Sequence, residues 1–394
     1  MKHIQGIRRR TWAEINIDNA KHNYNIIRNA INDKVKLCCV IKANAYGHGA
    51  VELARLYESW GTDYFAVSNI EEALQLRKAG ITMPILVMGY TPPECAKELG
   101  TYRISQCVYS LGYARALNNR AAEAEVCVAI HIKVDTGMGR IGLECRPECS
   151  DGIKDAIDIC KLSNLNAEGI FTHFSVADED KGEDLNSYTN QQYQSFISAV
   201  NYLANNGIKF KVCHCANSAG IFLNSEYHMN MVRAGSVLYG LRPSPNSNIL
   251  GLKPVMSLKT TVSQVKEIFA GESVGYGRTF MSDRTTKVAT LAIGYADGLN
   301  RSSTGYNIMV NDCYAPIIGR ICMDQCMIDV TNIDCCAGDV VTVFSDQREV
   351  SADAIAAHIG TINYEVVCDI GERVPRVYIQ NDEVISIRDA IYNA

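Results

Sequence analysis

The run Val35-Lys36-Leu37-Cys38-Cys39-Val40-Ile41-Lys42 is short, almost continuously apolar and closed by a lysine. A run of this length without alternation is typical of a strand that is buried on both faces of a parallel sheet. Seven more strands of the same kind are expected to follow it: Asp63–Ser68, Pro84–Gly89, Ser105–Ser110, Cys127–Asp135, Ala167–Phe174, Lys211–Ala216 and Met231–Leu241.

Helix-like stretches separate these strands: Ala50–Trp60, Ile70–Ala79, Asp151–Leu162 and Tyr193–Asn205. Several of them are followed by a glycine, which is a common residue at the end of a helix. Eight strands that alternate with helices over roughly 230 residues predict a (β/α)8 barrel. A doubly wound sheet is the competing interpretation, but no Gly-x-Gly-x-x-Gly sequence follows the first strand.

The second part of the chain has a different pattern of apolar and polar residues. Its apolar segments are short, alternating and rich in β-branched residues, and turn residues such as Asn311-Asp312 separate them: Ser257–Val265, Thr286–Ile293, Met327–Val330 and Val340–Phe344. The stretch Arg242–Asn248, with Pro243 and Pro245, has the composition of a linker. We therefore predict a barrel domain over residues 11–243 and a mostly-β domain over residues 244–394.

Composition excludes several classes of protein. The chain has 394 residues, 47% hydrophobic and 21% charged, with a net charge of −5, which disfavours a nucleic-acid-binding role. No apolar run approaches the roughly 20 residues that span a bilayer, and no secretory signal follows Met1, so a cytoplasmic protein is expected. The 16 cysteines are expected to be reduced thiols without a metal, because Cys213-His214-Cys215 has no second ligand pair.

Polar residues follow several of the predicted strands, where the active sites of barrels form. Lys42 closes the first strand, and the ends of later strands supply the segments His131–Arg140, Thr172-His173, His214–Ser218 and Arg233–Ser236. A lysine, an arginine and small donors able to hold a phosphate together make the composition of a pyridoxal-phosphate site. For Lys42 taken alone, a strand-end lysine that merely reaches solvent is the competing interpretation.

Four longer motifs carry a resemblance to a known family. They are Val40-Ile41-Lys42-Ala43-Asn44-Ala45-Tyr46-Gly47-His48-Gly49, Lys133-Val134-Asp135-Thr136-Gly137-Met138-Gly139-Arg140, Gly294-Tyr295-Ala296-Asp297-Gly298 and Gly319-Arg320-Ile321-Cys322-Met323-Asp324-Gln325. With these four motifs in this order, the chain resembles the alanine racemase family from about Thr11 to Tyr378. The resemblance implies a pyridoxal-phosphate-dependent isomerase that interconverts L- and D-alanine and feeds D-alanine to cell-wall synthesis.

The resemblance assigns two opposed bases. Lys42 matches the lysine that forms the Schiff base with pyridoxal 5'-phosphate and handles the proton on the D side. Tyr276 matches the base on the L side, which this family takes from a second subunit, so a homodimer with shared active sites is implied. Inversion through a planar intermediate needs one proton donor and one acceptor on opposite faces, because a single base tends to return the proton to the same face.

The remaining assignments are also implied by the resemblance. Arg233 matches the arginine that contacts the cofactor's ring nitrogen, and His214 matches the residue that supports this arginine. His173 matches part of the network around the tyrosine base and the cofactor. Arg140 matches the contact of the cofactor's phenolic oxygen and the substrate carboxylate, and Lys133 a lysine that is carbamylated in many members. The phosphate end is expected at Tyr46, Ser218, Gly235 and Ser236, and Asn217 is a further expected cofactor contact. The carboxylate contact is expected at the backbone of Met323. The access corridor is expected at Asp178, Tyr295, Arg301 and Arg320, with Asp324 as a further residue of the entry or its support.

One position departs from the pattern, because Glu372 stands where several members have a tyrosine near the phosphate. Serine racemases of vancomycin-resistance operons also depart there, so serine racemization is the alternative activity. Those relatives carry a membrane domain, and the interpretation of this chain as an excised catalytic half stays open. A barrel-type amino-acid decarboxylase would share the barrel, but the Tyr276 and Met323 motifs argue against it. A non-enzymatic cofactor carrier would stop after the barrel, whereas this chain continues through a second domain that carries Tyr276.

Overall fold

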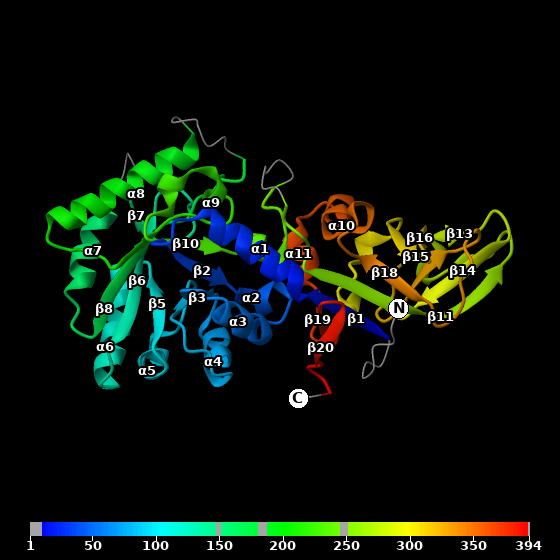
Figure 1. The fold of residues 1–394 in the computed structure, drawn as a ribbon, viewed down its shortest axis with the longest axis horizontal. Helices are drawn as coiled ribbons and strands as arrows, with labels where there is room; N and C mark the ends of the chain where they lie inside the picture. Colours follow the sequence, from blue (N-terminus) through cyan, green and yellow to red (C-terminus); the bar gives the residue numbers. More distant parts are fainter. Residues whose placement is uncertain (1–9, 147–150, 180–186, 245–250, 393–394) are drawn as a thin grey trace.

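The computed structural model describes residues 10–146, 151–179, 187–244 and 251–392. Figure 1 shows two bodies side by side, a barrel of strands and helices and a second body built mainly of strands. The predicted linker Arg242–Asn248 lies partly on residues 245–250, which are outside the described residues. Among the described helices, none is both long and apolar enough to cross a membrane.

The barrel has eight parallel strands in the order β10-β2-β3-β4-β5-β6-β8-β9. Their bounds are β2 Lys36–Val40, β3 Tyr64–Val67, β4 Ile85–Val87, β5 Ile104–Val108, β6 Val128–Asp135, β8 Leu165–Phe171, β9 Val212–His214 and β10 Met231–Ala234. Backbone hydrogen bonds join β9 to β10, since Asn230 N–H donates to Cys213 O and Arg233 N–H donates to Ala216 O. This nearly sequential, closing order confirms the barrel and excludes a doubly wound sheet.

Helices surround the barrel (Figure 1). They are α1 Ile17–Ala30, α3 Ala50–Ser59, α4 Ile70–Lys78, α5 Ala96–Thr101, α6 Leu111–Glu123, α7 Gly152–Cys160, α8 Tyr188–Asn205 and α9 Gly220–Leu223. Side-chain caps start several of them, as where Asn69 accepts from the backbone N–H of Glu72 at α4. Such caps satisfy N–H groups that have no partner within the helix.

The strand predicted over Met231–Leu241 is wrong in its second half. β10 ends at Ala234, and a 3₁₀ turn, η3 Ser236–Tyr239, follows it. Gly235 has φ −119° and ψ −100°, which breaks the extended backbone, and Gly240 ends the turn with φ 72°. Glycine adopts such conformations without a steric penalty. The sequence from Met231 to Leu241 stays apolar through both glycines, so its pattern gives no sign of this break.

The second body is a nine-stranded sheet in the order β14-β17-β16-β15-β18-β11-β1-β19-β20, which confirms the mostly-β architecture. Its strands after the barrel are β11 Met256–Ile268, β14 Thr286–Leu291, β15 Asn307–Val310, β16 Cys313–Ile318, β17 Cys326–Asp329, β18 Val340–Phe344, β19 Arg376–Gln380 and β20 Glu383–Arg388. Two helices, α10 Ala352–Ile359 and α11 Asn363–Cys368, pack beside it. In Figure 1, α11 lies between this sheet and the barrel.

The first strand corrects the expectation that the barrel domain begins at residue 11. β1, Thr11–Asn16, lies in the second sheet, antiparallel to β11 and parallel to β19. Ala13 is opposite Leu258 on one side and Arg376 on the other. The strand is mostly buried because it is paired on both edges, a long-range pairing that its own six residues do not indicate.

Candidate active site

Lys42 stands at the carboxyl end of β2, at the start of a turn of unusual handedness. The turn α2, Lys42–Tyr46, has φ between 51° and 54° at Ala43, Asn44 and Ala45. Left-handed helical backbone costs about 1–2 kcal/mol per non-glycine residue, because Cβ approaches the following carbonyl oxygen. Interactions outside the turn must therefore hold it.

Glu72 of α4 holds the front of this turn. Its two carboxylate oxygens accept from Ala43 N–H (2.6 Å) and Ser68 N–H (2.7 Å). A carboxylate that accepts backbone N–H groups makes hydrogen bonds roughly twice as strong as neutral pairs. The lysine is thereby fixed at the barrel mouth by a neighbouring helix.

The second sheet holds the back of the turn. From β19, Arg376 Nε donates to Gly47 O (2.9 Å) and the Tyr378 hydroxyl donates to His48 O (3.0 Å). Gly47 has φ 79°, and a Cβ there would collide with the carbonyl oxygen of Val367. The approach of the two bodies thus requires glycine at this position.

Four cationic side chains gather at the mouth: Lys42, Lys133, Arg140 and Arg233. Burial, followed by the charge of Arg140, lowers the pKa of Lys42. Burial also lowers the pKa of Lys133 to about 8, and the charges of Arg233 and Arg140 act in the same direction. Like charges disfavour one another's charged forms, so this mouth is suited to an anion.

Arg233 is buried on β10 and is hydrogen-bonded to residues at the ends of β8 and β9. Its Nη1 donates to His214 Nδ1 (2.8 Å), and its Nη2 donates to Thr172 O (2.8 Å) and Cys215 O (3.0 Å). His173 Nδ1 lies 3.2 Å from the same Nη2. Burial lowers the pKa of Arg233 to about 10, so the guanidinium remains protonated at neutral pH.

A group of small donors lies at the ends of β9 and β10. The Ser218 hydroxyl accepts from Gly235 N–H (2.9 Å), and a Cβ on Gly235 would lie 2.8 Å from the Tyr46 hydroxyl. Ser236 is hydrogen-bonded to the side chain of Tyr364. The absence of a side chain at Gly235 opens backbone access to this corner, as a phosphate-binding loop needs.

Other predicted residues occupy less direct positions. Asn217 caps the following turn, since its Oδ1 accepts from Gly220 N–H (2.9 Å). Arg140 and Arg301 are exposed. Burial raises the pKa of the Tyr364 phenol, and the charge of Asp178 acts in the same direction. Glu372, where the chain departs from the family pattern, is exposed.

Tyr276 lies on the second body, away from these residues in the sequence and on an exposed turn. It is 73% exposed and follows Gly275, whose φ is 73° and ψ −173°. A groove of about 520 Å³ beside it is lined by β11, β14 and β17 side chains and by Cys322 and Gln325. Within the described residues, no hydrogen bond or ion pair reaches the Tyr276 hydroxyl.

The loop over residues 319–325 lies next to this turn. Met323 is 53% exposed, and its carbonyl oxygen accepts from Ala296 N–H (3.0 Å), while Tyr295 N–H donates to Cys322 O (3.0 Å). Asp324 pairs with Arg373 (2.6 Å). The two motifs around Tyr295 and Met323 are therefore held together by backbone hydrogen bonds, on the face that carries Tyr276.

Arg320 forms the other side of the Tyr276 turn. A Cβ on Gly277 would lie 2.6 Å from Arg320 Nη1, so the guanidinium packs closely against the turn. Gly277 has φ 74°, a conformation that favours glycine. The structure therefore brings Arg320 to the tyrosine and leaves the lysine on the other body.

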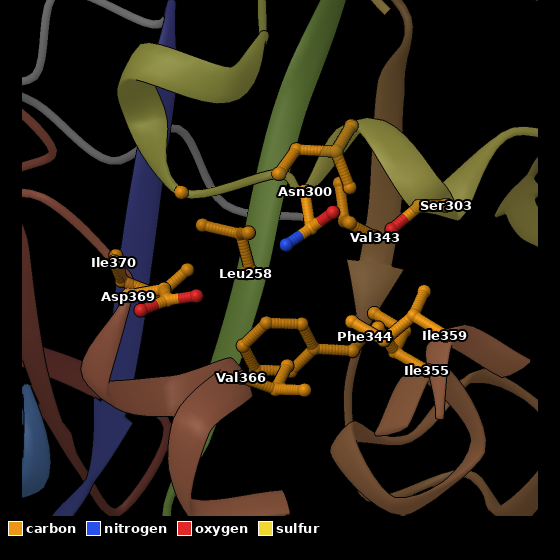
Figure 2. A pocket seen from close by; sticks show the side chains of 12 residues that line it. Leu258, Asn300, Ser303, Val343, Phe344, Ile355, Ile359, Val366, Asp369 and Ile370 are labelled. Atoms are coloured by element: carbon orange, nitrogen blue, oxygen red, sulfur yellow. The ribbon is translucent and has the colours of Figure 1, made fainter. Parts of the chain in front are cut away.

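A small apolar cavity in the second body is a separate feature. Figure 2 shows its lining, in which Leu258, Phe344 and Val366 face one another. Its free space, about 10 Å³, is enough for about one water molecule. The buried Ser303 hydroxyl on its wall has no hydrogen-bond partner among the described residues, so the cavity suits a bound water, and an amino-acid substrate is too large for it.

Sequence reasoning missed three residues that shape the mouth and one that lies deeper in the barrel. Glu72 belongs to none of the motifs, and its role in holding the turn after Lys42 follows only from the position of α4. Arg376 and Tyr378 reach the mouth from the last part of the chain. Glu168, which lies at the opposite end of the barrel from Lys42, is a polar residue inside an apolar strand, and that irregularity is a signal that sequence reasoning can use.

Comparison with known proteins gives matches along almost the whole chain. Residues 15–243 match the family described as alanine racemase, N-terminal domain, and residues 255–378 match alanine racemase, C-terminal domain. The chain is 44% identical to alanine racemase 1 of Clostridium acetobutylicum over 396 aligned positions, which cover 99% of this chain and 100% of that protein.

Solved structures agree with the fold. The alanine racemase of Clostridium difficile 630 superposes with a TM-score of 0.91 at 40% identity, over 97% of this chain and 99% of that one. The alanine racemase of Bartonella henselae, solved with covalently bound pyridoxal phosphate, superposes with a TM-score of 0.82 at 28% identity, over 94% of this chain and 99% of that one.

Proposed function

The chain belongs to the alanine racemase family, and on that premise we propose that it interconverts L- and D-alanine on pyridoxal phosphate, with Lys42 and Tyr276 as opposed bases. The observation that carries the proposal is the meeting of Lys42, Arg140 and Arg233 at one barrel mouth. Serine racemization is the weaker alternative, since it rests only on the exposed Glu372.

The residues present fit pyridoxal phosphate. Lys42 supplies the amine for covalent attachment, and the corner of Tyr46, Ser218 and Gly235 supplies polar groups and open backbone for a phosphate. When bound, the cofactor withdraws electrons from the substrate's α-carbon and so makes its proton removable. Each remaining step belongs to the chain's own side chains.

Lys42 is proposed as the base on the D side. Its amine can take or give a proton near neutral pH only if its pKa lies below that of a free lysine, and burial and Arg140 lower it. Arg140 is also placed to bind the substrate carboxylate, because a guanidinium matches that group in shape and charge. Lys42 would then face one side of the α-carbon.

Arg233 is proposed as the partner of the ring nitrogen. All the contacts that fix it are to acceptors, and its pKa of about 10 keeps it protonated. A group that only donates leaves the ring nitrogen without a proton of its own. Such a site favours rapid return of the proton to the α-carbon over transamination.

A second copy of the chain is proposed to supply Tyr276. The tyrosine is 73% exposed beside a groove, on a separate body from Lys42. A two-fold dimer that sets this face over the partner's barrel mouth would give two shared sites. The exposed Met323, whose backbone N–H is proposed to bind the substrate carboxylate, would enter the same site.

Reduced thiols favour a cytoplasmic location, which we also propose. The described cysteines are free, and many of them are buried. Buried cysteines in a chain of this size act as small apolar residues, and disulfide-poor chains of this kind are typical of reducing compartments.

The test of the activity is a racemization assay on alanine and on serine with the wild-type chain and Lys42→Ala. We expect alanine to be turned over faster, and a loss of at least about 10³-fold in the variant, since it removes both attachment and a base. Lys34→Ala, a change at a solvent-exposed lysine, is the matched control. Faster turnover of L-serine than of L-alanine would move the assignment to serine racemization.

The shared site has its own test, which uses two inactive variants. Lys42→Ala and Tyr276→Phe chains are unfolded together, refolded and assayed. If the dimer shares its sites, half of the dimers are mixed and each has one intact site, so activity should return to about a quarter of the wild-type value. No recovery, with dimers present by light scattering, would exclude sharing.

A further inference from the structure

A line of polar side chains crosses the interior of the barrel, from the mouth toward its opposite end. His214 Nδ1 accepts from Arg233, and His214 Nε2 lies 2.9 Å from His131 Nδ1. His131 Nε2 lies 3.3 Å from the Tyr64 hydroxyl and 3.4 Å from Glu168 Oε1. Tyr64 in turn donates to that carboxylate (2.9 Å).

The donors and acceptors of this line admit one arrangement of protons. An arginine has no acceptor, so His214 Nδ1 must accept and its proton must be on Nε2. That proton points at His131 Nδ1, which must accept in turn, so the proton of His131 is also on Nε2. Glu168 is an acceptor when ionised, so the sequence of bonds is consistent from Arg233 to Glu168.

The fold makes room for this line at some cost. His131 and His214 are fully buried, and the same interior holds the apolar cluster of Cys38, Val40, Tyr64, Ala66, Leu86, Val212 and Met231. A Cβ on Gly169, the residue paired with His131, would collide with the imidazole. A glycine inside a strand weakens it, so its presence indicates that the imidazole requires this space.

Glu168 provides the negative end of the line. Burial opposes its ionisation, but hydrogen bonds from His131, Ser105 and Tyr64 lower its pKa to about 2. Ser105 donates to the same Oε1 atom (2.6 Å). No carboxylate of the described residues lies within ion-pair distance of Arg233, so Glu168 is the anion linked to it through hydrogen bonds.

We propose that Glu168 is a positioning residue for Arg233. Through Tyr64, His131 and His214, it accepts at the far end of the line, supports the proton directions that Arg233 imposes at the mouth, and so holds the guanidinium in place as a donor. The inference rests on the proposed function in one respect, namely that Arg233 meets the cofactor's ring nitrogen. It adds that a carboxylate at the far end of the barrel influences that contact.

The first test uses the unmodified holoenzyme. Nitrogen-15 NMR of ring-labelled histidines distinguishes the two neutral tautomers from the cation. We expect His131 and His214, assigned by comparison with His131→Gln and His214→Gln, to be neutral and protonated only on Nε2 at pH 7. A proton on Nδ1 of either ring would overturn the proposal, whether or not the enzyme racemizes alanine.

The second test compares two partly exposed carboxylates that each accept several hydrogen bonds. Glu168→Gln keeps the shape but removes the charge, whereas Glu58→Gln changes a carboxylate that accepts three hydrogen bonds from Thr82 and Met83 and has no link to the line. For Glu168→Gln we expect kcat to fall about tenfold with KM for alanine within about twofold, as for loss of a hydrogen bond to a charged group. The ring signals of His131 and His214 should move in this variant only.

Glu168→Asp should restore part of kcat and return the ring signals toward the wild-type positions, because the charge is kept. A Glu168→Gln enzyme with the kcat and the ring signals of Glu58→Gln would overturn the proposal. If Glu168→Gln does not fold, the tautomers of His131 and His214 in the wild-type holoenzyme still test the proposal. A wild-type chain without racemase activity but with the expected tautomers would contradict the proposed function and leave this inference standing.

Discussion

Lys42 lies in a crowded and cationic barrel mouth, whereas Tyr276 stands on an exposed turn of the second sheet. Burial and the charge of Arg140 lower the pKa of the lysine, and contacts from both bodies hold the left-handed turn that begins at it. The tyrosine has a glycine on each side and no hydrogen-bond partner among the described residues of its chain. The proposed base Lys42 is therefore shaped by its own subunit, whereas the proposed base Tyr276 would acquire its surroundings from a second copy of the chain.

Tyr276→Phe tests the tyrosine side of this comparison and should give the largest loss of activity. We expect racemization to fall by about 10²–10⁴, because a general base is removed while the fold of an exposed turn is unaffected. Exchange of the α-proton of D-alanine with D2O should continue, since Lys42 is the proposed base on that face. Tyr314→Phe, at another exposed tyrosine, is the control. Equal loss of exchange from both enantiomers would contradict the division of labour.

Gly47→Ala tests the clamp on the lysine side. Its Cβ would collide with Val367 O and would need φ 79°, so we expect a loss of about 2–4 kcal/mol in the free energy of unfolding and a matching loss of activity. Gly61→Ala is the matched control, because Gly61 has φ 90° with open space around it. Urea denaturation of both variants gives the comparison, and equal losses would show that the contact with the second body is unimportant.

Lys133→Met tests the charge of the mouth. The pKa of Lys133 is about 8 in the folded chain and 10.5 in the unfolded one, so the unfolded chain binds more protons between these values. The buried charge therefore costs most stability below pH 8, and that cost fades as the pH rises to 10.5. We expect the variant to be more stable than wild type at pH 7, by about 1–3 kcal/mol, and the difference to shrink at pH 10.

The same measurement is informative about carbamylation. The neutral amine of Lys133 can add to CO2 with loss of a proton, which converts the cation into an anion beside Arg140. In that case the wild-type chain should be more stable than Lys133→Met when bicarbonate is present. The carbonyl of the carbamate should appear in carbon-13 spectra after labelling with carbon-13 bicarbonate. A stability difference that is independent of both pH and bicarbonate would contradict the cationic assignment.

Met323→Leu should give the smallest effect. The proposed contact with substrate uses the backbone N–H, and the side chain is 53% exposed. We expect kcat/KM for alanine to stay within about twofold, since a swap of similar volume leaves the loop in place. Met323→Pro, which removes the N–H, is the informative counterpart. A large loss in the leucine variant would place the side chain itself in the site.

The sequence by itself determined much of this protein. Apolar runs such as Val35–Ile41 predicted the parallel strands, because burial on both faces leaves little room for polar residues. The position of Lys42 at a strand end, and the motif that follows it, predicted the site. These features are local, so a short window of residues contains the information.

Tertiary structure alone decided the rest. The pairing of β1 with β11 and β19, the collision that requires Gly47 and the line from Arg233 to Glu168 each join residues that are far apart in the chain. Long-range pairings depend on the packing of the whole molecule, and no local pattern of side chains specifies which distant partner will be met. For this reason the candidate reacting residues could be named from the sequence, whereas the contacts that hold them in place could not.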